Sequence, residues 1–133
     1  MFKGAFTHGS GYAQTRGGKL NKLRKFMHQV RADFYLYGHM HDIIIETMPV
    51  LESDKVCRLK DTTAIGAVTG CYFRTYTQGV APSYGELRNM DPVVIGSPVV
   101  LFDPTNNFVT IQDTRNPKYS YGEVQYQETM TLK

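Results

Sequence analysis

The chain has 133 residues, of which 41% are hydrophobic and 20% are charged, so it is long enough for one domain with a buried core. Two cysteines are too few for a disulfide scaffold, no apolar run approaches the roughly 18 residues of a membrane span, and the first residues lack the apolar core of a signal peptide. We therefore expect a cytoplasmic protein that does not use a membrane as a partner. The net charge of +3 is compatible with an anionic substrate but does not require one.

Up to Tyr37 the sequence predicts a strand, a glycine-rich loop, a helix and a second strand. Residues 2–6 form a short apolar strand, and a loop rich in glycine follows it. From Lys19 to Arg31 apolar side chains recur with helical spacing, and Phe34–Tyr37 is again a short apolar strand. Such strand–helix–strand units usually join parallel strands of one sheet.

Histidines follow both of these strands. His8 comes after the first strand, and Gly38-His39-Met40-His41 comes after the second. In an extended segment residues two apart point to the same side, so His39 and His41 can face one point in space. Because parallel strands end at one edge of a sheet, where α/β proteins tend to bind ligands, we expect His8 to join them there. Neutral imidazole is a common metal ligand, which makes a metal site the leading interpretation. The alternative is a surface turn with solvated histidines.

Beyond Asp42 the sequence predicts mainly antiparallel strands. Three strands are expected in succession, with turns at Glu52-Ser53-Asp54 and Lys60-Asp61: Ile43–Leu51, Lys55–Lys60 and Thr62–Gly70. Tyr84–Asn89 is expected to form a short helical turn, and residues 97–103 and 108–113 a hairpin around Pro104-Thr105-Asn106-Asn107. Residues 114–133 are polar with scattered tyrosines, and we expect either a polar tail or an added edge strand.

The order of these motifs resembles a known family. Thr7-His8-Gly9, a helix and then Gly38-His39-Met40-His41 resemble the C-terminal half of the calcineurin-like metallophosphoesterases. Three later segments resemble phage and bacterial members: Thr69–Tyr76, Ser83–Glu86 and Ile95–Pro98. The resemblance implies an α/β fold in which residues 1–113 form the C-terminal portion of the metallophosphoesterase domain, a partial α/β/β/α sandwich that begins with the strand–helix–strand unit.

The resemblance also implies a site for two divalent metal ions, which in this family are Mn, Zn, Fe or Ni. His8 and His39 would bind one ion and His41 the other. The family's earlier ligand blocks, Asp-x-His, Gly-Asp and Gly-Asn-His, have no counterpart in this chain. The catalytic acid therefore stays unassigned. Three imidazoles bring no negative charge to hold two dications close together. We interpret the chain as half of such a fold, weakly active or inactive alone, with a missing N-terminal half or a second copy as its partner.

Other residues are candidates for supporting roles. Asp42 is a candidate acceptor that orients His41, although a simple turn carboxylate is the plainer interpretation. Ser10 and Arg16 lie in the glycine-rich loop, which could wrap a phosphate with its backbone N–H groups or be a flexible substrate-side loop. Tyr72, Phe73 and Tyr76 are candidates for base stacking or for core packing.

Our leading hypothesis is a metal-dependent phosphoesterase, a hydrolase of phosphomonoesters or phosphodiesters, with nucleic acid among its candidate substrates. Two alternatives stay open. One is a non-catalytic remnant that serves binding or assembly. The other is a single zinc ion held by the three histidines with one open position.

Overall fold

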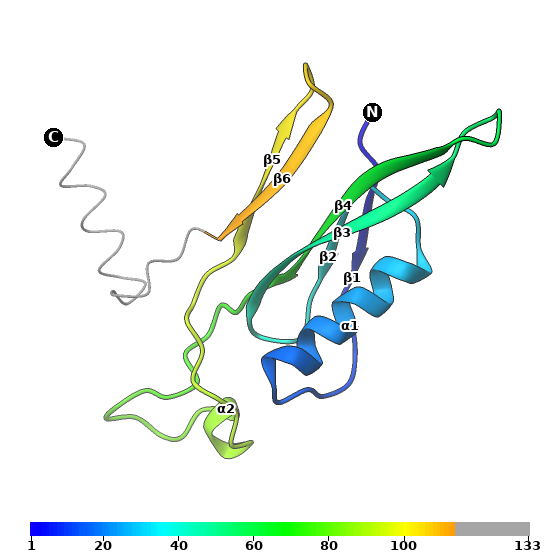
Figure 1. Cartoon of the computed structure of the whole chain (residues 1–133). Helices are drawn as coiled ribbons and strands as arrows, with labels where there is room; N and C mark the ends of the chain where they lie inside the picture. Colours follow the sequence, from blue (N-terminus) through cyan, green and yellow to red (C-terminus); the bar gives the residue numbers. More distant parts are fainter. Residues whose placement is uncertain (114–133) are drawn as a thin grey trace, which may run out of the picture.

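The computed structural model describes residues 1–113, in which a four-stranded mixed sheet carries the site. The strand order is β1 (Gly4–Thr7), β2 (Phe34–Tyr37), β4 (Leu59–Thr69) and β3 (Ile43–Ser53). β1, β2 and β4 run parallel, and β3 is antiparallel to β4. Helix α1 (Arg16–Gln29) connects β1 to β2 (Figure 1). The strand–helix–strand unit with parallel strands is therefore confirmed.

Helix α1 begins a turn earlier than the apolar spacing predicted. The side chain of Thr15 accepts a hydrogen bond from the N–H of Gly18 at 3.1 Å, which satisfies one of the free donors of the first turn. Val30 has extended backbone angles and ends the helix. Local capping, which a count of apolar residues does not register, explains the shift.

The buried face of α1 lies on the middle of the sheet. Leu23 and Met27 are almost fully buried there. They come so close to β4 that a Cβ on Gly66 would lie 2.8 Å from Met27 Sδ. The ring of Phe26 meets Tyr35 of β2 edge-on, with ring centres 5.9 Å apart. The core of the molecule therefore lies between α1 and strands β2 and β4.

A second sheet covers the opposite face. The hairpin of β5 (Pro98–Asp103) and β6 (Phe108–Asp113) packs there, with the ring centres of Phe102 and Phe34 5.3 Å apart. Phe34 and Tyr35 are neighbours in β2, so they point to opposite faces of the sheet. The order of layers is thus helix, four-stranded sheet and two-stranded sheet (Figure 1). The predicted hairpin is confirmed.

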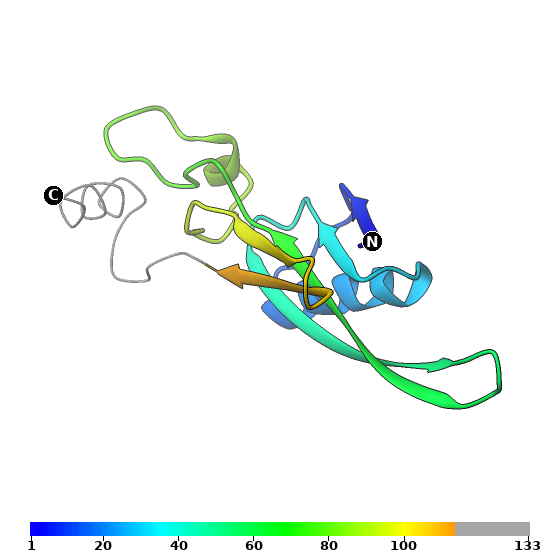
Figure 2. The same cartoon turned by 90° about the horizontal axis from the view of Figure 1, so that it is seen from above.

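The predicted turn at Lys60-Asp61 is wrong, and so is most of the predicted strand Lys55–Lys60, because β4 begins only at Leu59. Lys60 and Asp61 lie inside β4, where they pair with Glu52 and Leu51 of β3. The chain turns instead after Asp54, whose carboxylate accepts hydrogen bonds from the N–H groups of Val56 and Arg58. Because β3 and β4 pair along their whole length, they extend beyond β1 and β2 as a curved two-stranded arm (Figure 2).

The rest of the chain contains the short helix α2 (Tyr84–Leu87), as predicted. Within residues 1–113, neither helix is of a length and composition that would cross a membrane. The tail or edge strand predicted for residues 114–133 lies outside the described residues.

Replacing Leu23 with alanine should lower the free energy of unfolding by about 2–5 kcal/mol, because the side chain is fully buried between α1 and the sheet. Leu59→Ala is the matched control, since Leu59 is 74% exposed and should change stability by less than about 0.5 kcal/mol. Urea unfolding followed by circular dichroism measures both. Equal losses in the two variants would contradict the placement of the core.

Candidate functional site

His8 and His39 lie side by side at the carboxyl edge of the sheet. β1 and β2 pair in register to their last residues, and the N–H of Gly38 donates to the carbonyl of Thr7 at 3.0 Å. The residue after β1 is His8, and the residue after β2 is Gly38, which precedes His39. As a result, His39 Nδ1 lies 3.2 Å from His8 Nε2. Two imidazole nitrogens bound to one tetrahedral zinc ion would be about 3.3 Å apart. The spacing therefore suits a shared cation, and it also suits a hydrogen bond between the two rings.

A strained turn presents His39. The N–H of Met40 donates to the carbonyl of Gly38 at 2.9 Å, and His39 between them has φ of 71°. This is a γ turn with a positive central φ, a rare and strained form. His41 also has a positive φ, of 51°. The extended conformation predicted for this segment is therefore wrong. Backbone strain of this kind is concentrated at functional sites.

Met40 and two glycines make the turn possible. Met40 is buried in the core, 5% exposed, so it anchors the turn between His39, which is exposed, and His41, which is half-buried. A Cβ on Gly38 would lie 3.0 Å from the carbonyl oxygen of His8. Gly9 has φ of 77° and leaves room for the ring of Tyr37. The glycines that flank the histidines thus allow the two loops to approach each other.

His41 lies on the inner side of the turn. Its ring centre is 6.4 Å from that of His39, and its ring meets Phe73 edge-on at 5.0 Å. Burial lowers the pKa of His41, and the charges of His39, Lys19 and His8 lower it further. Its Nδ1 atom is buried and has no hydrogen-bond partner within residues 1–113. A neutral imidazole with an unpaired buried nitrogen is chemically suited to bind a cation or a polar ligand group.

Asp42 ties the turn to helix α1. One carboxylate oxygen lies 3.5 Å from Lys19 Nζ, and the other lies 3.5 Å from Arg16 and accepts from the N–H of Ile43 at 2.8 Å. Arg16 also donates to the carbonyl of Ile43 at 3.1 Å. These contacts are with α1 and the start of β3 rather than with the ring of His41. They hold the segment that carries the histidines.

Ser10, the remaining predicted residue, lies in the loop beside the histidine pair. Its N–H donates to the hydroxyl of Tyr37 at 3.3 Å, and its carbonyl accepts from Lys22 at 3.1 Å. These backbone contacts fix the loop between β1 and α1. The side chain of Ser10 is on an exposed residue.

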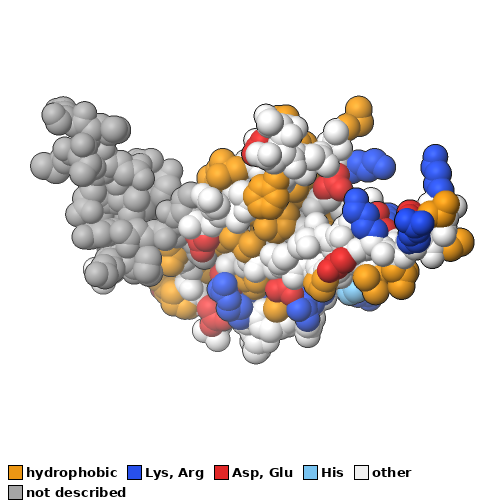
Figure 3. Space-filling view, turned by 45° about the horizontal axis from the view of Figure 1, so that its top comes forward, with side chains coloured by type: hydrophobic (Ala, Val, Ile, Leu, Met, Phe, Trp, Pro, Cys, Tyr) orange, Lys and Arg blue, Asp and Glu red, His pale blue; other side chains and the backbone are white. Residues whose placement is uncertain are grey.

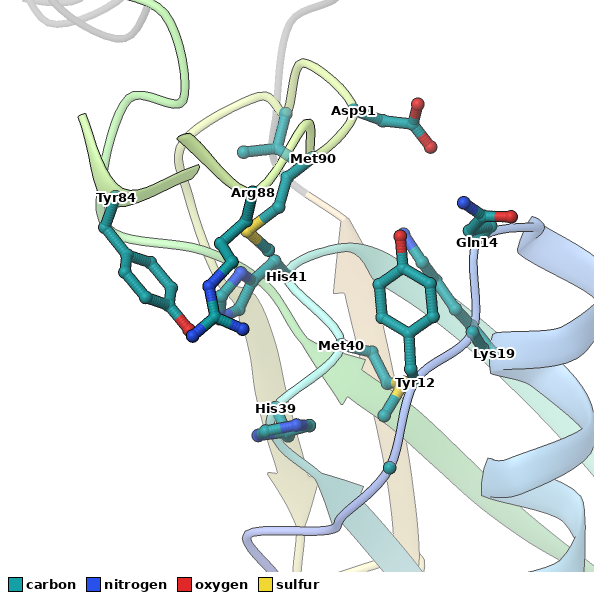
Figure 4. A pocket seen from close by; sticks show the side chains of 13 residues that line it. Tyr12, Gln14, Lys19, His39, Met40, His41, Tyr84, Arg88, Met90 and Asp91 are labelled. Carbon is teal, nitrogen blue, oxygen red and sulfur yellow. The ribbon is translucent and has the colours of Figure 1, made fainter. Parts of the chain in front are cut away.

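A cavity of about 460 Å³ adjoins His39 and His41 (Figure 4). One wall is the loop after β1, and the other is the segment that contains α2, with these lining residues among others: Tyr12, Gln14, Lys19, Tyr84, Arg88 and Asp91. The predictions from sequence missed the α2 side of this cavity. The Ser83-x-x-Glu86 capping pattern indicates a helix start there but not its position beside the histidines.

Buried and aromatic residues bring the α2 segment to the site. Thr75 is 3% exposed, and its hydroxyl donates to the carbonyl of Asp91 at 3.3 Å. The hydroxyl of Tyr76 donates to the carbonyl of Met90 at 2.9 Å. Of the aromatic residues considered for base stacking, Phe73 packs on His41, the hydroxyl of Tyr76 holds the lining segment, and Tyr72 is exposed.

His8 and His39 are thus brought into contact, with His41 set to one side of the pair. Within the described residues, no group of three or more histidine, cysteine, aspartate and glutamate side chains is arranged to hold a metal ion. Compared with known proteins, the chain matches no family model, no curated protein and no solved structure. The chemistry of the site has therefore to be inferred from its own residues.

Replacing Asp42 with alanine should cost about 1–3 kcal/mol of stability, because it leaves the Lys19 ammonium, whose side chain is 11% exposed, without its anion. Asp61→Ala removes an exposed carboxylate from β4 and should have little effect. Thermal unfolding of the two variants measures the difference. A loss for Asp61→Ala as large as that for Asp42→Ala would rule out the anchoring role.

The pKa of His41 should lie below 6.5 in the metal-free protein, and Phe73→Ala should raise it by exposing the ring to water. The folded-state pKa is lower than the unfolded value. The stability that neutral His41 contributes is therefore present above about pH 6.5 and lost as the pH falls through the folded-state pKa. An NMR titration of the imidazole protons in EDTA gives the pKa, and a midpoint at or above 6.5 would contradict the burial argument.

Proposed function

We propose that this chain is the C-terminal portion of a metal-dependent phosphoesterase, with His8 and His39 as ligands of one divalent ion and His41 as a ligand of a second. The observation that carries the proposal is the 3.2 Å contact between the two imidazole nitrogens, presented at the ends of adjacent parallel strands. The strained γ turn at His39 supports it, since a chain without a functional need for that geometry would gain stability by relaxing it.

The position of His41 favours two ions over one. Two imidazoles on one tetrahedral ion have ring centres about 5 Å apart. The rings of His8 and His39 match this at 5.2 Å, whereas His39 and His41 are wider apart at 6.4 Å. The buried Nδ1 of His41 has no hydrogen-bond partner among residues 1–113, and a second ion would supply one. Mn, Zn, Fe and Ni all accept imidazole ligands, and the donor set does not choose among them.

The chain's own residues would bind and orient the ester. Arg88 lines the cavity beside His41 and offers positive charge to an anionic phosphate ester, whereas the ammonium of Lys19, which also lines it, is paired with Asp42. Two bound ions would supply an activated hydroxide and stabilise charge on the phosphoryl oxygens. A bridging carboxylate has to come from elsewhere, because the nearby Asp42 is already paired with Arg16 and Lys19.

An open sheet edge supports the view that this is one part of a larger fold. β1 is the end strand of its sheet and has β2 as its only strand neighbour within residues 1–113. Phe6 on β1 is 66% exposed. In the space-filling view, hydrophobic side chains form an exposed group near the centre of the visible face (Figure 3). Unpaired edges and exposed apolar surface are typical of surfaces that bind another chain. An N-terminal half or a second copy that pairs with β1 would place its own residues beside His8. The added strands and helix would also complete an α/β/β/α sandwich.

The same edge favours a second candidate, a binding or assembly module that performs no catalysis. Metal binding separates the two candidates, because an assembly module needs no ligands at the carboxyl edge.

The purified chain should bind Mn²⁺ or Zn²⁺, and His39→Ala should weaken binding by at least about a hundredfold, because it removes one of the paired nitrogens. His28→Ala, an exposed position on α1, is the control and should bind as the parent does. Isothermal titration calorimetry measures both. Hydrolysis of a generic phosphodiester should be weak or undetectable for the chain alone. An absence of metal binding, or equal binding by the two variants, would reject the phosphoesterase and leave the assembly module.

A further inference from the structure

The cavity beside His39 and His41 is larger than a phosphate group needs. Its volume of about 460 Å³ falls within the range of roughly 300–1,000 Å³ that is usual for small-molecule sites. Its lining includes Met40 and Met90 as well as polar residues. A metal-bound phosphoryl group at the histidines would leave most of this space for the remainder of the ester.

Two tyrosines that face water form opposite sides of the cavity. Tyr12 comes from the loop after β1 and is 67% exposed, and Tyr84 comes from α2 and is 62% exposed. Figure 4 shows the ring of Tyr12 on one side of His41 and the side chains of Tyr84 and Arg88 on the other. The guanidinium carbon of Arg88 lies 5.2 Å from the centre of the Tyr84 ring. Flat aromatic and guanidinium surfaces at a cavity mouth are suited to stack on another planar ring.

Polar side chains accompany these flat surfaces. Gln14 and Asp91 line the same cavity and offer hydrogen-bond donors and acceptors. A nucleobase has both a stacking face and hydrogen-bonding edges, and its nucleotide also carries the phosphate that Arg88 would attract. A phosphorylated serine or threonine has no ring and would leave Tyr12 and Tyr84 uncovered.

We propose that this cavity binds the nucleobase of a nucleotide, with the phosphate directed toward His39 and His41. The direction of the phosphate rests on the proposed phosphoesterase function, whereas base binding depends only on the cavity. The nucleotide is either free or the end of a single strand, because both present the same base and phosphate.

The test is binding of AMP, adenosine and ribose 5-phosphate to the whole chain in EDTA, measured by NMR titration. AMP and adenosine should bind, and ribose 5-phosphate should bind at least tenfold more weakly. Tyr12→Ala and Tyr84→Ala should each weaken the binding of AMP by about 5- to 150-fold, which is the range for losing one stacking partner. Tyr12→Phe and Tyr84→Phe should retain binding because the ring remains. Tyr72→Ala is the control, since Tyr72 is 76% exposed and does not line the cavity.

Comparing AMP with a short 5′-phosphorylated oligoadenylate distinguishes the two sources of the base. Tighter binding of the oligonucleotide identifies a strand end, and equal or weaker binding identifies a free nucleotide. Equal affinities for ribose 5-phosphate and AMP would overturn the base site. So would Tyr12→Ala and Tyr84→Ala variants that bind AMP as tightly as Tyr72→Ala does. Because EDTA removes metal ions, that failure is distinct from a failure of metal binding, which would overturn the phosphoesterase and leave the base site standing.

Discussion

The hydrogen bond from the N–H of Gly38 to the carbonyl of Thr7 sets the geometry on which the candidate site depends. It is the last bond of the parallel pairing between β1 and β2, and it brings His8 level with Gly38. A shift of one residue in this register would turn the side chains of β2 to the other face of the sheet and separate the two histidines. The absence of a side chain at Gly38 is part of the same constraint, because a Cβ there would press on the carbonyl of His8.

That bond fixes where the turn begins, and Asp42 fixes where it ends. Between them, His39 and His41 adopt positive φ values that each cost on the order of 1–3 kcal/mol. Burial of Met40 and the contacts of Asp42 with α1 offset this cost and keep the turn from relaxing. The short loop can hold two imidazoles at fixed positions because one of its ends is bonded to the sheet and the other contacts helix α1.

Local patterns in the sequence were sufficient for most of the elements but not for the shape of the site. The apolar spacing around Leu23 predicted α1, and the parallel strands it joins correctly placed His8 and His39 at one edge. The turn at His39 could not be predicted, because it depends on the approach of Gly38 to His8, far away in the sequence. Lys60 and Asp61 have the composition of a turn, yet pairing with β3 makes them strand residues. Tyr84 reaches the cavity only through the tertiary contacts of the segment around Thr75.

The two functions proposed for this edge of the sheet depend on different parts of the fold. A dinuclear centre needs negative charge that the three histidines do not bring, so it depends on residues that would approach along β1. The proposed base site needs only Tyr12, Tyr84 and their neighbours, all of which lie within the described residues. Tyr12 belongs to the loop that also carries His8, and Tyr84 belongs to the segment that packs beside His41. Under these proposals, a partner that docked on β1 would supply the missing negative charge next to a cavity that this chain forms by itself, so one chain would bind the substrate and the other would complete the metal centre.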